Sequence, residues 1–230
     1  MATVALIHGA GDSGWAWHSV ADELHSRGHT VVAPDLPSEQ DDAGLSEYAS
    51  TVGEALRSAG TPYPSPLVVV GHSLGAFTAP VVAEQQKADR LVLIAPMIPL
   101  PGETVNQWWS ATGYTDAARE QGEADGGLTN NADPIVSFYN EVPRDIAEEA
   151  MRRARTQSAG PMDEPLPLGA WPDVPTRVLL FRDDRFLPAA FGRRLADNRL
   201  GVVAEELPGG HCSPLSHPAE LAYALLRDVD

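Results

Sequence analysis

Short apolar runs alternate with amphipathic segments along most of this chain, and this alternation limits the folds open to it. Six runs have the length of strands: residues 4–7, 30–33, 67–70, 90–95, 177–181 and 202–207. Five further segments have helical character: residues 15–26, 46–58, 76–86, 189–197 and 218–228. Runs that are apolar throughout indicate strands buried on both faces, which is typical of parallel sheets covered by helices. We therefore expect a three-layered α/β fold with a doubly wound parallel sheet.

One long stretch interrupts this alternation. No strand is evident between Pro96 and Pro175, whereas residues 103–113 and 143–156 have helical character and residues 122–131 are typical of a loop. An insertion at the carboxyl edge of a parallel sheet would lie over the crevice where ligands bind. We therefore expect a single domain over residues 1–230, with a short helical lid at about 97–165. A surface excursion without function is the alternative.

Composition excludes several classes of partner. The net charge of −16 provides no basic surface for nucleic acid or an anionic membrane. No stretch approaches the ~20 apolar residues of a membrane span, and residues 1–7 lack the basic start of a signal peptide. The single cysteine, Cys212, cannot form an internal disulfide, so we expect a cytoplasmic protein. We expect no metal and no cofactor, and a homodimer stays open.

A nucleophile motif lies between the apolar run 67–70 and the helical segment 76–86. It reads Gly71-His72-Ser73-Leu74-Gly75, the G-x-S-x-G pattern in its strand–turn–helix context. The sharp turn pushes the serine hydroxyl out of the sheet, and side chains in place of the glycines would collide with neighbouring elements. We predict Ser73 as a nucleophile, the alternative being an ordinary Ser-Gly turn.

The loop after the first strand has the small residues that an oxyanion hole requires. It reads His8-Gly9-Ala10-Gly11-Asp12-Ser13-Gly14. A tetrahedral intermediate needs two N–H donors, and we expect them from the amides of Ala10 and Leu74. A phosphate-binding loop is excluded because the glycine spacing is wrong, no lysine follows, and Asp12 would repel phosphate.

A serine nucleophile needs a general base and a group that orients the base. His211 follows the last strand run at the same edge as Ser73, which makes it the predicted base. The other histidines lie elsewhere, with His72 directed away by the turn and His8 bracing the oxyanion loop. Asp183 and Asp184 both follow the run 177–181, and only one of them can reach the imidazole.

Several segments together carry a family resemblance. They are His8-Gly9-Ala10 with Trp15-Ala16-Trp17, the motif around Ser73, Phe138-Tyr139-Asn140-Glu141-Val142-Pro143, Asp184-Arg185-Phe186-Leu187-Pro188-Ala189-Ala190-Phe191, and Gly209-Gly210-His211. Nearly the whole chain resembles the α/β-hydrolase superfamily. More narrowly, it resembles the small esterase and hydroxynitrile-lyase branch that includes plant methylesterases.

This resemblance implies a six-stranded sheet in the order 2-1-3-4-5-6 and a triad of Ser73, His211 and Asp184. In that branch the acid lies seven residues before a helix phenylalanine, and Phe191 therefore favours Asp184 over Asp183. Two departures favour ester hydrolysis over cyanohydrin cleavage. Cys212 stands where the lyases carry a lysine, and Gly9 stands where they carry a threonine.

The predicted reaction is hydrolysis of small to medium carboxylic esters through an acyl-enzyme intermediate. We predict that the substrate contacts residues of the oxyanion loop, the lid and the base loop, namely Gly9, Asp12, Trp108, Trp109 and Cys212. Core packing is the alternative for both tryptophans. The alternative activities are thioester cleavage, C–C bond hydrolysis and lyase chemistry with the same triad, or ligand binding without catalysis.

Overall fold

The computed structural model describes residues 1–60 and 63–227. Within them, six strands form one parallel sheet in the order β2-β1-β3-β4-β5-β6. They are β1 (Thr3–Ile7), β2 (Thr30–Val32), β3 (Leu67–His72), β4 (Arg90–Ile94), β5 (Thr176–Phe181) and β6 (Glu205–Leu207). The strand order predicted from the sequence is confirmed. All strands run toward the same edge, so the loops that follow them gather there.

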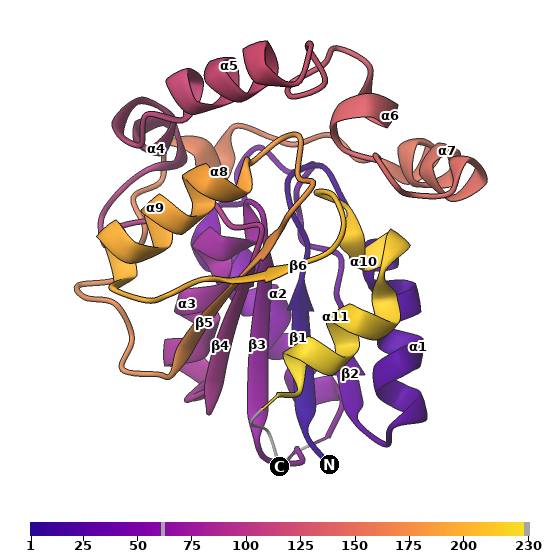
Figure 1. Cartoon of the computed structure of the whole chain (residues 1–230). Helices are drawn as coiled ribbons and strands as arrows, with labels where there is room; N and C mark the ends of the chain where they lie inside the picture. Colours follow the sequence, from indigo (N-terminus) through magenta and orange to yellow (C-terminus); the bar gives the residue numbers. More distant parts are fainter. Residues whose placement is uncertain (61–62, 228–230) are drawn as a thin grey trace.

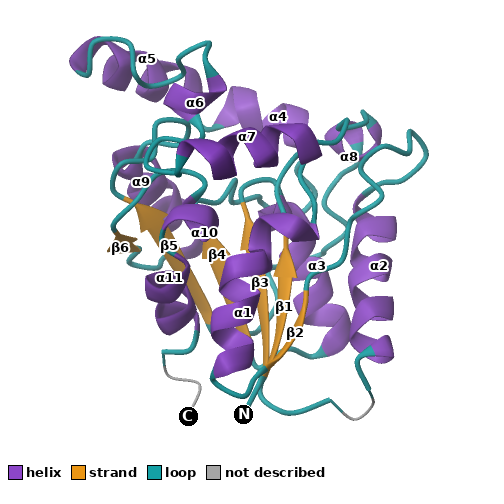
Figure 2. Ribbon diagram, turned by 90° about the vertical axis from the view of Figure 1, so that its right-hand side faces the viewer, coloured by secondary structure: helices purple, strands orange, loops and turns teal. Residues whose placement is uncertain are grey.

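Helices cover both faces of this sheet (Figures 1 and 2). One face carries α1 (His18–Ser26) and α11 (Pro218–Leu225), and the other carries α2 (Leu45–Ser58), α3 (Gly75–Gln86) and α9 (Ala189–Leu200). Successive strand residues alternate between the two cores: Leu6 and Val70 face α1 and α11, whereas Ile7 and Val69 face α2 and α3. Burial of both faces explains the continuously apolar strand runs.

The ends of the outer elements differ slightly from the sequence prediction. The run 202–207 forms a strand only at Glu205–Leu207, where residues 179–181 of β5 offer partners. The last helix ends at Leu225, and Asp228 lies outside the described residues. A short 3-10 helix, η1 (Gly14–Trp17), precedes α1.

The insertion between β4 and β5 is helical, and most of it lies over the carboxyl edge of the sheet (Figures 1 and 2). It contains α4 (Val105–Ala111), α5 (Tyr114–Ala124), α6 (Pro134–Ser137), α7 (Arg144–Arg153) and α8 (Gly160–Asp163). α4 begins after Thr104, whose hydroxyl accepts the N–H of Gln107 at 3.0 Å in a reciprocal cap. α5 extends three residues into the stretch 122–131 that the sequence predicts as a loop. Most glycine and asparagine residues of this stretch follow Ala124, so the helix can continue to that residue.

A long-range contact ends α7 earlier than the sequence suggests. The predicted helix 143–156 extends only over Arg144–Arg153, and the backbone leaves the helical conformation at Ala154. The N–H of Arg155 then donates to the carbonyl of Gly11 at 2.7 Å. The N–H of Arg155 thus holds the loop after β1 and is not available for a hydrogen bond within α7.

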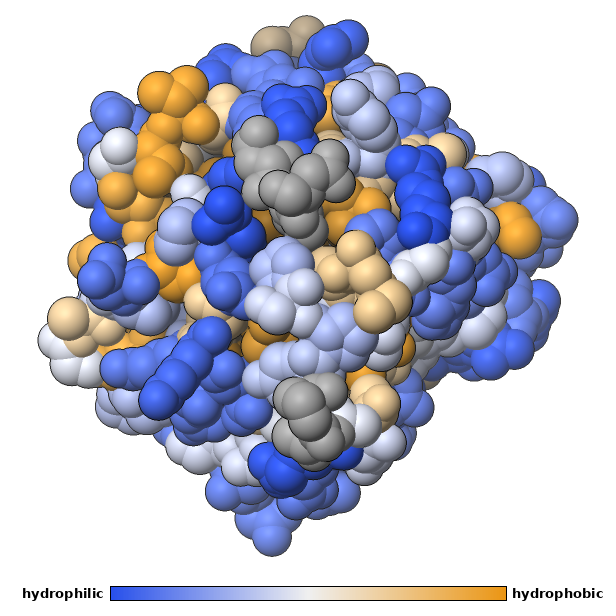
Figure 3. All heavy atoms as spheres, turned by 90° about the horizontal axis from the view of Figure 1, so that it is seen from below, coloured by the Kyte–Doolittle hydropathy of each residue, from blue (hydrophilic) through white to orange (hydrophobic). Residues whose placement is uncertain are grey.

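The opposite end of the molecule is mostly hydrophilic. Seen from the side of both termini, it shows small separated hydrophobic patches among polar residues (Figure 3). Across the described residues, no helix is both long and apolar enough to cross a membrane.

Candidate active site

Ser73 occupies a strained turn between β3 and α3. Its φ of 53° lies in the left-handed region, which non-glycine residues rarely adopt. The two flanking glycines make the turn sterically feasible. A Cβ on Gly71 would lie 2.7 Å from the Cβ of Ala79 on α3, and one on Gly75 would lie 2.7 Å from the carbonyl oxygen of His8. The turn therefore presents the serine above the edge of the sheet, as the motif predicts.

His211 and Asp184 form a buried pair beside this turn. Nδ1 of His211 donates to Oδ2 of Asp184 at 2.8 Å, and both side chains are almost fully buried. The other carboxylate oxygen of Asp184 accepts the N–H groups of Phe186 and Leu187, each at 2.8 Å. Three donors thus fix the carboxylate, which in turn fixes the imidazole. Asp183 is exposed and does not pair with the imidazole.

Two residues without a role in the sequence interpretation hold this pair in place. Nε2 of His72 donates to the backbone carbonyl of His211 at 3.0 Å, so its side chain supports the histidine loop instead of pointing elsewhere. Burial lowers the pKa of His72 well below its usual value and keeps its ring neutral. The side-chain amide of Asn140 donates to the carbonyl of Asp183 at 2.8 Å, which braces the acid loop. These contacts span 139 and 43 residues, and no local pattern signals them.

The loop after β1 lies directly beside the serine. A Cβ on Gly9 would lie 3.1 Å from the Cβ of Ser73, so this close approach requires a small residue. Within the described part of the chain, the amide N–H groups of Ala10 and Leu74 have no hydrogen-bond acceptor. These are the two donors that the sequence predicts for an oxyanion hole, and both border the turn at Ser73 or the cavity above it.

Neighbouring side chains hold this loop at both ends. Nδ1 of His8 donates to the carbonyl of Gly9 at 2.8 Å, and its Nε2 accepts the N–H of Leu36 at 3.0 Å. Burial lowers the pKa of His8 to about 4, so the ring stays neutral and keeps both contacts. Gln157 accepts the N–H of Gly11 at 3.2 Å through its side-chain carbonyl. The bracing role predicted for His8 is therefore compatible with its contacts.

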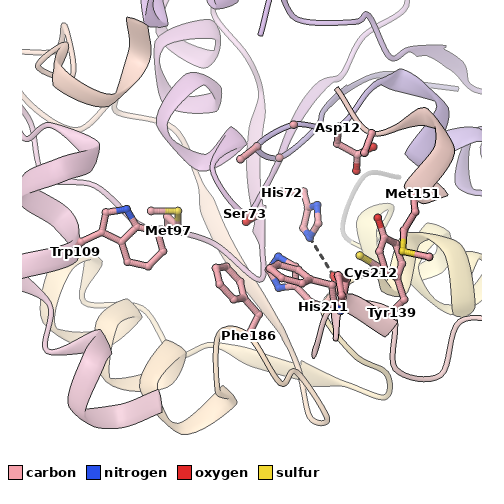
Figure 4. A pocket seen from close by; sticks show the side chains of 16 residues that line it. Asp12, His72, Ser73, Met97, Trp109, Tyr139, Met151, Phe186, His211 and Cys212 are labelled. Atoms are coloured by element: carbon pink, nitrogen blue, oxygen red, sulfur yellow. Dashed lines mark hydrogen bonds between the residues drawn. The ribbon is translucent and has the colours of Figure 1, made fainter. Parts of the chain in front are cut away.

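A cavity of about 360 Å³ lies above the serine, between the sheet edge and the insertion. Its wall contains Ser73, His211 and the oxyanion loop together with mainly apolar residues: Met97, Trp109, Pro134, Phe138, Tyr139, Met151, Ala154 and Phe186. Trp109 and Met97 lie at one end of it, and Asp12, Tyr139, Met151 and Cys212 lie at the other (Figure 4). Ser73 and His211 lie between the two ends (Figure 4).

The structure separates the two tryptophans of α4. Trp109 lines the cavity, whereas Trp108 is fully buried in the core, where its indole N–H donates to the carbonyl of Ile98 at 2.9 Å. Adjacent positions on a helix point about 100° apart, so only one of the two can face the cavity. Of the predicted substrate-contacting residues, Gly9, Asp12, Trp109 and Cys212 line the cavity and Trp108 does not.

Two titratable groups in the cavity are perturbed by burial. The pKa of Asp12 is raised to about 6, mainly because its carboxyl is removed from bulk water. The pKa of the Cys212 thiol is raised well above its usual value, first by burial and then by the charges of Asp12 and Asp184. The thiol therefore stays protonated at neutral pH and is a poor nucleophile. Among the described residues, no cluster of His, Cys, Asp and Glu has the geometry of a metal site.

The strained serine, the histidine–aspartate pair and the covered sheet edge define a class of protein. Residues 4–225 match the alpha/beta hydrolase family, and the chain belongs to that family. The pyrethroid hydrolase of Sphingobium wenxiniae is 27% identical over 249 residues, which cover 99% of this chain and 87% of the relative. The carbendazim hydrolyzing esterase of Nocardioides sp. is 27% identical over 246 residues, which cover 98% of each chain.

The fold is also shared with a solved esterase. The crystal structure of polyneuridine aldehyde esterase aligns over 100% of both chains with a TM-score of 0.79, at 20% sequence identity. The resemblance to the small esterase branch, inferred from the sequence, is thus confirmed, and the chain has esterases among its relatives.

Proposed function

We propose that this protein is a serine hydrolase that cleaves small to medium carboxylic esters. The observation that carries the proposal is the shared cavity of Ser73 and His211, with Asp184 bound to the far side of the imidazole at 2.8 Å. This arrangement contains a nucleophile, a base and a group that orients the base. The pyrethroid hydrolase and the carbendazim hydrolyzing esterase among the relatives support the same reaction class.

Acylation is the first half of the reaction. The Oγ of Ser73 attacks the ester carbonyl carbon while its proton passes to Nε2 of His211. The carbonyl oxygen becomes an oxyanion, which accepts hydrogen bonds from the N–H groups of Ala10 and Leu74. The intermediate then collapses as His211 gives its proton to the oxygen of the leaving alcohol. Asp184 stabilises the imidazolium throughout this step.

Deacylation repeats these steps with water. His211 removes a proton from a water molecule, which attacks the acyl carbonyl carbon, and the oxyanion forms again between Ala10 and Leu74. The bond to Oγ breaks, Ser73 regains its proton from His211, and the carboxylic acid leaves. The reaction needs no metal or cofactor, because every proton transfer uses the imidazole.

The insertion and the cavity support the proposed substrate size. A volume of about 360 Å³ suits a small or medium ligand, and the wall around the reacting atoms is mostly apolar. We propose that the insertion, about residues 97–165, acts as the lid of a single domain and separates the acyl-enzyme from bulk solvent, while it leaves room for the one water molecule that deacylation consumes. Trp109, Phe138 and Phe186 would contact the apolar part of the ester.

Removal of the nucleophile tests this proposal. We expect Ser73→Ala to lower kcat for p-nitrophenyl esters by ~10³-fold or more while the protein keeps its fold. The matched control is Ser50→Ala, which removes an exposed hydroxyl on α2. A fluorophosphonate should label Ser73 in the wild type, as read by peptide mass spectrometry. Labelling or turnover that survives in Ser73→Ala would assign the chemistry to another residue.

A further inference from the structure

A carboxyl group that the proposed chemistry does not use faces the reaction cavity. Asp12 belongs to the oxyanion loop and lies at the end of the cavity that Tyr139, Met151 and Cys212 also line (Figure 4). One of its oxygens accepts the N–H of Ser13 at 2.8 Å. The rest of the carboxyl is available to a molecule in the cavity.

Residues 1–60 and 63–227, which the structure describes, supply no lysine or arginine partner to this carboxyl. Among the described residues, no lysine or arginine nitrogen lies within 4.0 Å of Asp12. Two arginines near this loop are already engaged, since Arg153 pairs with Glu149 and Arg155 pairs with Glu39. The charges of His211 and Asp35 affect the pKa of Asp12. The charge of Asp12 in turn raises the pKa values of Tyr139 and Cys212. None of these is a permanent positive charge.

Ionisation of a carboxylate that has no cationic partner in a cavity is energetically unfavourable. Removal of a charge from water destabilises it unless an opposite charge replaces the lost hydration. The pKa of Asp12, raised to about 6 by burial, is the consequence of this missing partner. At pH 7 and above the group is nevertheless mostly ionised. A ligand that brings its own cation would therefore gain the interaction that the protein lacks.

We propose that Asp12 is a specificity-determining residue that selects esters carrying an ammonium group, which pairs with its carboxylate. The inference rests on the proposed ester hydrolysis and names the substrate class. The ammonium group lies at the Tyr139 end of the cavity, and the ester carbonyl lies between Ser73 and the two oxyanion donors. The apolar remainder extends toward Trp109 and Met97.

Two further features favour a cation over a neutral hydrogen-bond donor. The aromatic rings of Phe138 and Tyr139 line the same cavity, and ring faces attract cations. The net charge of −16 attracts cationic and repels anionic ligands over the whole molecule. A neutral hydroxyl group would hydrogen-bond to Asp12 but would leave its charge without a counterion.

Pairs of isosteric esters test this inference. One pair differs in the alcohol: the 2-(dimethylamino)ethyl and 3-methylbutyl esters of acetic acid. The other differs in the acid: methyl 4-(dimethylamino)butanoate and methyl 5-methylhexanoate. We expect the wild type to prefer the ammonium member of at least one pair by tenfold or more in kcat/KM at pH 8. Asp12→Asn, which keeps the size of the side chain, should reduce that ratio at least tenfold.

The control variant removes the same charge elsewhere. Asp22→Asn changes an exposed carboxylate on α1 and should leave the ratio unchanged. The wild-type ratio should also fall between pH 8 and pH 5, as Asp12 takes up a proton with a pKa of about 6. The ratio isolates this effect, because any pH effect on the chemical step that both esters share cancels in it.

Binding to an inactive variant separates this inference from the ester hydrolysis. Calorimetric titration of Ser73→Ala with each pair should give tighter binding of the ammonium member, and the added Asp12→Asn change should abolish the difference. Absent turnover of every ester would contradict the proposed function, whereas this binding preference would still support the Asp12 site. Equal binding of both members, a preference that survives Asp12→Asn, or an equal advantage for a 2-hydroxyethyl ester would overturn the inference.

Discussion

Two adjacent aspartates have different environments in this structure. The carboxylate of Asp184 binds the imidazole of His211 and two backbone amides, whereas the side chain of Asp183 is exposed. Only Asp184 can therefore control the orientation and tautomer of the His211 imidazole. The difference arises because successive residues that leave a strand point in different directions.

The two aspartates thus predict unequal effects of the same substitution. Asp184→Asn should lower kcat for p-nitrophenyl acetate by ~10³–10⁴-fold, because an amide in this position holds the wrong tautomer of His211. Asp183→Asn, the matched control, should change kcat by less than about tenfold. Steady-state kinetics of both variants measure this. The reverse ranking would assign the acid role to Asp183.

The raised pKa of Asp12 predicts that the free energy of unfolding depends on pH. Its pKa is about 6 in the folded chain and 3.8 in the reference state, so the folded chain binds this proton more tightly. The contribution of Asp12 to folding is therefore most favourable below pH 4 and decreases by up to ~3 kcal/mol as the pH rises through 6. Asp12→Asn should raise Tm at pH 8 and raise it much less at pH 4.5. Thermal unfolding that shows the same gain at both pH values would contradict this.

At the scale of elements, a buried ion pair attaches the insertion to the sheet domain. The guanidinium of Arg199 on α9 binds the carboxylate of Glu103, with 2.9 Å between Nη2 and Oε1. It also donates to the carbonyl of Ile98 at 2.8 Å. Both side chains are less than a tenth exposed. α9 thereby holds the segment that leads from β4 into α4, and through it the position of Trp109.

Loss of this pair should destabilise the protein. Arg199→Met leaves the carboxylate of Glu103 buried without a partner, and we expect a loss of ~3–5 kcal/mol in the free energy of unfolding. The double variant Arg199→Met/Glu103→Leu should recover most of this loss, because it removes both charges. Arg119→Met, which breaks exposed pairs on α5, should have little effect. Urea unfolding of the three variants measures the difference. Equal losses of unfolding free energy in Arg199→Met and Arg119→Met would contradict a stabilising role of the buried pair.

At the scale of the whole molecule, the residues around the histidine agree better with the proposed ester hydrolysis than with release of cyanide. The residue after His211 is Cys212, a half-buried cysteine whose raised thiol pKa keeps it neutral. Gly9 adds no hydroxyl group, and its Cβ position lies 3.1 Å from that of Ser73. The cavity therefore has donors for an oxyanion but no cationic side chain on the loop that follows the base to hold a cyanide ion.

This difference predicts the reaction class. We expect measurable hydrolysis of p-nitrophenyl acetate, abolished in Ser73→Ala, and no appreciable release of cyanide from mandelonitrile. Initial rates on both substrates decide between the two activities. Cyanide release that exceeds ester turnover would favour lyase chemistry, and turnover of neither substrate would favour the non-catalytic binding protein.

The sequence by itself predicted a parallel sheet covered by helices and the candidate residues of the site, and the family resemblance added the order of the strands. The apolar runs indicate strands buried on both faces, and the glycines around Ser73 indicate a turn that only small residues permit. Such local signals survive in sequence because each depends on a few neighbouring residues. The choice of Asp184 over Asp183 needed the family resemblance as well, since local pattern alone left both open.

The tertiary structure alone decided how the site is held and which residues line its cavity. His72 reaches His211 across 139 residues, and Gln157 reaches Gly11 across 146. The early end of α7 also depends on contacts between distant segments, as does the fact that Trp109 and not Trp108 faces the cavity. The surroundings of Asp12 also depend on tertiary structure, because Tyr139 and Met151 of the insertion and Cys212 of the histidine loop line the same end of the cavity. Spacing along the chain contains no information about such contacts, since they form only when the insertion folds over the sheet.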